Sequence, residues 1–214
     1  MKSKIVILIS IIVIFLLGCE EKSLVSFNEP QPKGINNLNE FPKKLIGEYY
    51  DFDTKTNLII SKTFIEKKQL LKDTLKVSEL DSNEVVKNDY IINLKTNEKI
   101  KIIKINDTTF VTNYDFTRRI FSFDDGDLIR KYKGYYFLNL KSSSTDWEVK
   151  KLFLKKGVLS INEIQTETEI EVLKNILDSK SDTIRPFGAN PTKRQFKEFL
   201  KNNGFSSGEL YLKK

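Results

Sequence analysis

The sequence predicts a mainly β fold of the α+β class: an antiparallel β-meander or barrel-like sheet with two short helices near the C-terminus. Between residues 45 and 164, short runs rich in Val, Ile, Thr, Phe and Tyr alternate with turns rich in Asn, Asp and Gly. Most connections between these runs are short, which favours antiparallel pairing of neighbouring strands. After residue 164 the apolar residues follow a helical period instead.

The strand runs are recognised by composition, because β-branched and aromatic side chains favour the extended backbone. The stretch 66–80 fits neither the helical nor the strand period well, and we predict it as strand. The expected strands, in chain order, cover residues 45–50, 66–80, 91–94, 99–105, 108–111, 119–123, 128–130, 135–138, 147–154 and 158–161.

Two local features refine this pattern. The Asp-Gly pair within Asp124–Asp127 separates the runs 119–123 and 128–130, and such a pair between apolar runs predicts that they form a hairpin. The alternation slips at Ile102-Ile103, which predicts a bulge or burial on both faces.

Both helices are predicted from their first turns. Thr166 is followed three residues later by Glu169, and Thr192 by Gln195, which is the spacing of a capping box. Apolar residues on one face follow each box, and Gly204 lies where the second helix should end with a glycine cap. A final strand is expected at residues 210–212.

The first nineteen residues indicate where the protein resides. A basic start is followed by an apolar run from Ile5 to Leu17, and then by Leu16-Leu17-Gly18-Cys19. This arrangement resembles the lipobox of bacterial lipoproteins. The resemblance implies cleavage after Gly18 and a diacylglycerol on the Cys19 thiol. The alternative is an uncleaved N-terminal anchor, although the apolar run is shorter than the roughly 20 residues of a membrane-spanning helix.

The predicted organisation has three parts: a signal peptide (1–18), a lipidated Cys19 with a flexible tether (19–40), and a single β-rich globular domain (41–214). Residues 20–40 are poor in apolar side chains and contain two prolines, which favours a tether. Glu20 and Glu21 resemble the acidic export tag of surface lipoproteins in some Gram-negative bacteria. The expected location is the outer membrane of the cell envelope, on its periplasmic face or at the cell surface.

Composition excludes several function classes. The chain contains no histidine and one cysteine, so Ser-His-Asp and Cys-His nucleophiles and the common zinc sites cannot form. Its net charge of +7 is spread along the sequence rather than gathered in one run, and with export this argues against nucleic acid as a partner. We therefore predict no enzyme activity, no catalytic residue, no cofactor and no metal site.

The remaining motifs have ordinary structural interpretations beside functional ones. Asp51 and Asp53 could act as paired acids, but a solvated strand end is the favoured interpretation. The carboxylates of Asp124–Asp127 lack the spacing of an EF-hand calcium loop. Aromatic residues in the strands could line a pocket, but a packed core is favoured. These aromatic residues are Tyr49, Tyr50, Tyr114, Phe121, Phe123, Tyr135, Tyr136, Phe137 and Trp147.

Gly47-Glu48-Tyr49 resembles a softened form of the Gly-x-Trp start of lipocalin-like barrels, with Tyr in place of Trp. Across most of its length the chain resembles small lipoproteins of Gram-negative bacteria that have no assigned function. The leading expectation is a non-catalytic binding or interaction module in the cell envelope, attached to the membrane through Cys19 and facing an envelope protein. The alternative is a lipocalin-like carrier of a lipid or another small apolar ligand.

Overall fold

The computed structural model describes residues 23–179 and 186–214, and these form two compact units. The small unit is residues 69–116, and the large unit is the described part of residues 22–68 and 117–214. The sequence predicts a single globular domain over residues 41–214, and within it the strand-rich middle of the chain forms a compact unit of its own. Strands β5 (Phe64–Lys76) and β9 (Thr109–Ser122) contribute residues to both units.

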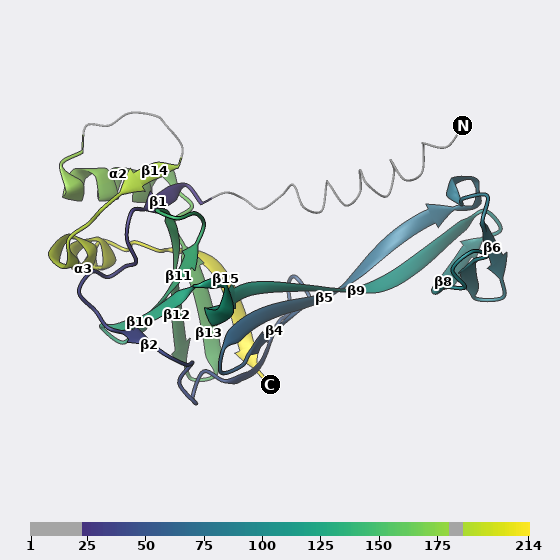
Figure 1. Ribbon diagram of the computed structural model, residues 1–214, viewed down its shortest axis with the longest axis horizontal. Helices are drawn as coiled ribbons and strands as arrows, with labels where there is room; N and C mark the ends of the chain where they lie inside the picture. Colours follow the sequence, from purple (N-terminus) through teal and green to yellow (C-terminus); the bar gives the residue numbers. More distant parts are fainter. Residues whose placement is uncertain (1–22, 180–185) are drawn as a thin grey trace. The chain divides into compact units, whose positions relative to one another are not determined.

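Antiparallel strands dominate the structure, and two short helices accompany them, as the sequence predicts (Figure 1). The small unit adds β6 (Glu84–Lys87), β7 (Tyr90–Asn93) and β8 (Lys99–Asn106). The other elements, all in the large unit, are β1 (Val25–Phe27), β2 (Asn37–Leu38), β3 (Gly47–Asp51), β4 (Thr56–Ile60), β10 (Leu128–Tyr132), β11 (Tyr135–Lys141), β12 (Trp147–Lys155), β13 (Val158–Glu163), α2 (Glu167–Leu177), β14 (Phe187–Ala189), α3 (Lys193–Lys201) and β15 (Ser207–Lys213).

The sheet of the large unit is open. Its strand order is β2-β10-β11-β12-β13-β15-β3-β4-β5-β9, and β2 and β9 are not paired with each other. C-terminal strand β15 lies between β13 and β3, so it joins the later hairpins to the earlier ones. Gly208 is essential at this joint, because a Cβ there would lie 2.1 Å from the carbonyl oxygen of Ile161.

Both faces of this sheet are packed. On β11, Leu138 lies in one hydrophobic core and Phe137 in the other, because successive strand residues point to opposite faces. The first core is enclosed by the sheet strands and the segment before β3, and includes Tyr49 and Phe121. The second is covered by α2, α3, β1 and β14, which lie together beside β11 and β12 in Figure 1. The aromatic residues of the strands are therefore mainly core residues, as favoured by the sequence.

The segment 23–40 belongs to the folded large unit, so the prediction of a flexible tether is wrong for these residues. Val25 and Phe27 are buried in the second core. Further along, the Asn139 side chain accepts from the Gln31 N–H and donates to the Gln31 carbonyl. Arg130 donates to two carbonyl groups of the same segment. Sequence composition missed this because backbone groups, rather than apolar side chains, make most of these contacts.

Both helices begin where the capping boxes predict. Thr166 Oγ1 accepts from the Glu169 N–H, and Thr192 Oγ1 accepts from the Gln195 N–H. The expected glycine cap of α3 is wrong, since the left-handed residue is Asn203, with φ 60°. Gly204 is required for another reason: a Cβ there would lie 2.4 Å from the Phe199 ring.

The predicted hairpin across residues 124–127 is wrong. β9 pairs with β5 and β8, whereas β10 pairs with β11 and β2. Between them the chain forms a 3₁₀ turn at Phe123–Asp125, and the buried Asp127 carboxylate accepts from the Ser122 and Lys141 N–H groups. These hydrogen bonds change the direction of the chain after β9. The Asp-Gly pair therefore lies in a turn between two strands that pair with different neighbours, and not in a hairpin.

The small unit has a thin core of three buried residues, Ile91, Ile102 and Phe110. The predicted strand at residues 66–80 is largely confirmed by β5. The irregularity expected at Ile102-Ile103 occurs further along, between Lys104 and Asn106. Among the residues that the structure describes, no helix has the length and apolarity needed to cross a membrane.

Candidate functional site

One face of the small unit carries exposed apolar side chains among the residues that the structure describes. Ile103 pairs with Val111, and Tyr90 pairs with Lys101, so all four side chains lie on the same side of the sheet. The register of β6 and β7 extends this set. We define the outer face of the small unit as Val85, Lys87, Tyr90, Ile92, Lys99, Lys101, Ile103, Ile105 and Val111.

The exposure of this face is high for apolar side chains. Ile103 and Ile105 are 58% and 60% exposed, whereas their neighbour Ile102 on the opposite face is 2% exposed. Of the eleven exposed large hydrophobic residues in the described chain, eight lie between residues 69 and 116, and four of these eight (Val85, Tyr90, Ile103 and Ile105) belong to the outer face. Isolated exposed apolar residues are ordinary, but a contiguous group of this kind marks an interaction surface.

Lysines are the main charged residues on the outer face. Lys87, Lys99 and Lys101 belong to it, and Asp115 follows Val111 on the same side of β9. A complementary surface would therefore combine apolar side chains with carboxylates, since like charges would be repelled.

A pocket of about 430 Å³ lies in the same unit. Phe110 and Leu80 supply apolar lining, Asp81, Glu84 and Asp107 supply carboxylates, and Lys104 supplies one positive charge. Since the carboxylates outnumber the lysine, this lining favours a group with an apolar body and a positive charge, such as a basic side chain.

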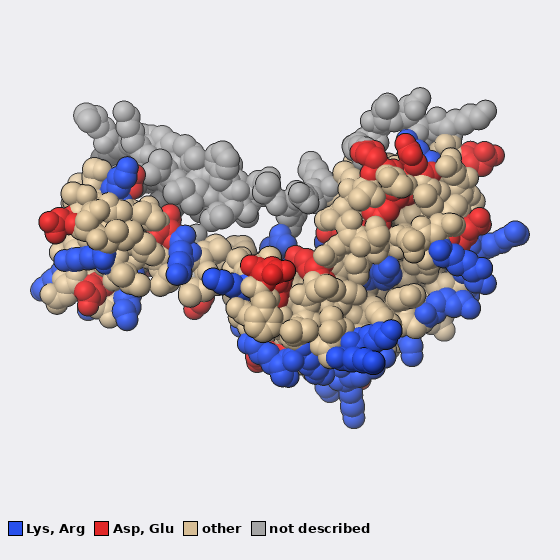
Figure 2. All heavy atoms as spheres, turned by 180° about the vertical axis from the view of Figure 1, so that it is seen from behind, with Lys and Arg blue, Asp and Glu red and all other residues tan. Residues whose placement is uncertain are grey.

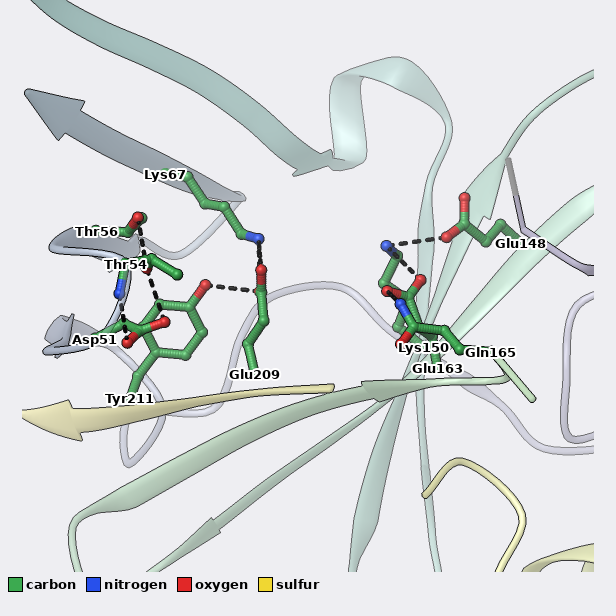
Figure 3. Close-up of polar contacts among 10 residues, drawn as sticks. All are labelled: Asp51, Thr54, Thr56, Lys67, Glu148, Lys150, Glu163, Gln165, Glu209 and Tyr211. Carbon is green, nitrogen blue, oxygen red and sulfur yellow. Dashed lines mark hydrogen bonds and ion pairs between the residues drawn. The ribbon is translucent and has the colours of Figure 1, made fainter. Parts of the chain in front are cut away.

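The large unit contains a charged cluster on the face of its sheet that packs the first hydrophobic core, here called the inner face (Figure 3). Lys150 Nζ lies 2.9 Å from Glu148 and 3.0 Å from Glu163. Gln165 donates a further hydrogen bond to Glu163. Burial alone would lower the pKa of Lys150, but the two carboxylates raise it above its ordinary value. Burial raises the pKa of Glu148, and Lys150 offsets part of this effect.

A second group of charges joins β5 to β15. Lys67 Nζ lies 2.5 Å from Glu209, and the Tyr211 hydroxyl donates to the same carboxylate at 2.7 Å. Burial would raise the pKa of Glu209, but Lys67 and Tyr211 together hold it below its usual value. Burial raises the pKa of Tyr211, and the adjacent Glu209 charge adds to the shift.

These two groups have the chemistry of a structural network. Lys150 is held protonated by two carboxylates, which makes it a poor nucleophile or base, and Lys67 is ion-paired with Glu209. Two of the ion pairs join different strands, Lys150–Glu163 between β12 and β13 and Lys67–Glu209 between β5 and β15, so the network helps to fix strand positions on a face that is otherwise apolar. Among the described residues, no group of Asp, Glu or Cys has an arrangement that could hold a metal ion.

Most of the residues that the sequence analysis considered as functional candidates have structural roles. Asp51 accepts from the N–H groups of Asp53 and Thr54 and from the Thr54 hydroxyl (Figure 3), which makes it a turn residue. Cys19 lies outside the described residues.

Sequence reasoning missed both the outer face and the charged cluster, because each depends on strand register. The slip at Ile102-Ile103 was the one local signal for the outer face. Comparison of the chain with protein-family models, curated proteins and solved structures finds no match.

Proposed function

We propose that this protein is a non-catalytic binding module of the bacterial cell envelope, attached to the outer membrane through a lipid on Cys19. Its partner is a protein, and it binds to the outer face of the small unit. The concentration of exposed apolar residues on that face carries the proposal.

The partner surface is defined by complementarity. Covering Ile103, Ile105 and Tyr90 removes apolar surface from water at about 25 cal/mol per Å². Carboxylates of the partner would pair with Lys99 and Lys101 at the edge of the contact, which favours association rate and specificity. The partner is therefore an envelope protein with an apolar patch bordered by Asp and Glu.

A non-catalytic role is supported by the charged cluster. Lys150 forms ion pairs with Glu148 and Glu163, and Lys67 forms an ion pair with Glu209. The chain has no histidine to supply a base near neutral pH. The carrier alternative has less support, since the inner face is filled by fourteen buried side chains and the sheet is open.

The partner contact can be tested by photo-crosslinking in intact cells. A benzoylphenylalanine replacing Tyr90, an aromatic position on the outer face, should give one discrete crosslinked protein. Ile103→Ser should abolish that product, because it replaces an apolar contact with a hydroxyl. Phe52→Ser is the matched control, since Phe52 is a similarly exposed aromatic residue of the large unit. A product that persists in Ile103→Ser would contradict the proposal.

The lipid anchor is tested separately by mass spectrometry of the mature protein. We expect a chain that begins at Cys19 and carries the mass of diacylglycerol. Cys19→Ala should abolish both the added mass and the cleavage. A Cys19→Ala chain that remains membrane-bound at full length would instead indicate an uncleaved anchor.

A further inference from the structure

One end of the large unit gathers exposed lysines from segments far apart in the sequence. They lie in the loop before β3, in three turns or strand ends, and at the C-terminal residues. We call this set the lysine end; its members are Lys43, Lys44, Lys62, Lys131, Lys133, Lys155, Lys156, Lys213 and Lys214. Figure 2 shows Lys and Arg side chains crowded at the lower side of the larger unit.

Strand register brings these lysines together. The β10–β11 turn and the β12–β13 turn lie at the same end of the sheet, because β11 and β12 are antiparallel neighbours. Lys155 pairs with Val158, which pairs with Leu212 beside the C-terminal lysines. Lys213 in turn donates to the carbonyl of Lys44.

The loop before β3 joins the same end through an aromatic ring. Lys44 and Lys131 both place their ammonium groups over Tyr136, at 5.4 and 5.9 Å from its centroid. The ring face offsets part of the repulsion between the two cations.

The positive charge at this end is scarcely neutralised. Among residues 23–179 and 186–214, two carboxylates form ion pairs with these lysines: Glu40 with Lys62 at 4.0 Å and Glu48 with Lys214 at 3.9 Å. Contacts of this length between exposed groups are weak. The small unit differs, since residues 69–116 hold seven lysines against eight Asp and Glu residues.

Apolar side chains border the lysine end. Leu210 and Leu212 are 63% and 46% exposed on the outward face of β15. Leu212 pairs with Tyr50 of β3, whose ring contacts the exposed Phe52. Lysines beside apolar and aromatic groups suit a bilayer surface, where cations meet lipid phosphates and apolar groups enter the headgroup region.

We propose that the lysine end docks on an anionic phospholipid surface. A soluble anionic polymer would satisfy the lysines but leave Leu210 and Leu212 in water, so the bilayer is the favoured ligand. The contact is separate from the proposed lipid anchor. β1, the first strand after Cys19, pairs with Trp147 at one end of β12, and the lysine end includes Lys155 at the other. Nine strand residues separate these ends by about 30 Å.

Vesicle partition of the full chain tests this docking. The chain is mixed with phosphatidylcholine vesicles and with vesicles containing phosphatidylglycerol, and the ratio of the two partition coefficients removes any contribution of the apolar N-terminal segment. We expect a preference for anionic vesicles of at least about tenfold at low salt, lost at high salt, since each lysine near the surface contributes about a fivefold factor.

Two matched variants locate the effect. A lysine-end variant replaces Lys43, Lys44, Lys133 and Lys156 with Gln and should lose at least about tenfold in that ratio. A control replaces Lys72, Lys76, Lys87 and Lys95 of the small unit with Gln, which removes the same charge. The proposal is overturned if the control loses as much as the lysine-end variant, or if the lysine-end variant loses nothing.

A further variant distinguishes a bilayer from a soluble polyanion. Leu210→Ser with Leu212→Ser should lower partition into anionic vesicles severalfold and leave polyphosphate binding unchanged. If the double variant loses neither vesicle partition nor polyphosphate binding, the lysine end would be assigned to polyanions and the lipid proposal would be overturned. The Tyr90 crosslink is independent of these lysines, so a failure here and a failure of the protein contact are distinguishable.

Discussion

The two units use apolar residues in opposite ways. The large unit buries fourteen residues in one core and twelve in the other, whereas the small unit buries three. The small unit nevertheless carries eight of the eleven exposed large hydrophobic residues in the described chain. A unit that withholds its apolar residues from its own core leaves them for a partner, and this difference is the basis of the proposed function.

The units also differ in charge. The small unit is close to neutral, so all of the net charge of +7 lies outside it. We thus assign the apolar protein contact to the small unit and the basic surface to the large unit. The following predictions test this division of roles.

The largest effect is expected in the core of the large unit. Phe137 is fully buried, and its ring contacts Phe196 and Phe205. Phe137→Ala should lower the free energy of unfolding of the large unit by about 4 kcal/mol, because it leaves a cavity in a close-packed core. Urea unfolding followed by the fluorescence of Trp147, the one tryptophan, measures this change. A loss below about 1 kcal/mol would show that the core can relax around the cavity.

The same kind of substitution in the small unit tests whether the units unfold separately. Phe110→Ala should destabilise the small unit by about 3 kcal/mol, since Phe110 is one of the three buried residues of its hydrophobic core. Amide hydrogen exchange in β7 and β8 should accelerate, while the Trp147 transition stays in place. A Trp147 transition shifted by the same amount would show one cooperative unit instead.

Removing the cation of the charged cluster should have an effect that depends on pH. Lys150→Met should cost about 3 kcal/mol at pH 8, because Glu148 and Glu163 are left without their shared partner. Burial already raises the pKa of Glu148, and without Lys150 that pKa lies further above its unfolded value, so the folded state binds more protons. The free energy of unfolding should therefore rise as pH falls from 8 towards 5.

Replacing one carboxylate is the control for this prediction. Glu148→Gln leaves the Lys150–Glu163 pair in place and should show neither the large loss nor the recovery at low pH. A Lys150→Met chain whose stability is independent of pH would contradict the assigned role of the cluster.

The smallest effect is expected on the outer face of the small unit. Ile105→Thr should change the stability of that unit by less than about 0.5 kcal/mol, because Ile105 is mostly exposed. Amide exchange measures this value. A larger loss would mean that the side chain packs within its own unit and is unavailable to a partner.

Local sequence signals predicted much of the secondary structure. The capping boxes at Thr166 and Thr192 predicted where both helices begin, since the hydrogen bonds that define each box join residues three positions apart. Composition fixed most strands and the mainly β class. These signals depend on neighbouring residues alone, and the structure contains the elements that they predicted.

The predictions failed where contacts between residues far apart in the sequence determine the structure. The Asp-Gly turn suggested a hairpin, but buried bonds of Asp127 direct the chain to other strands. The segment 23–40 looked like a tether until Asn139 paired with the Gln31 backbone, 108 residues away in sequence. The two compact units within the predicted domain depend on such distant contacts as well.

By itself, the sequence determined the fold class, the two helix starts, the absence of histidine chemistry and the N-terminal resemblance to a lipobox. Only the tertiary structure decided which isoleucines are exposed, which carboxylates share Lys150, and which lysines gather at one end. Strand register makes these decisions, because a shift of one residue would move every side chain of a strand to the other face. Composition and periodicity describe single segments, whereas register is a property of pairs of strands.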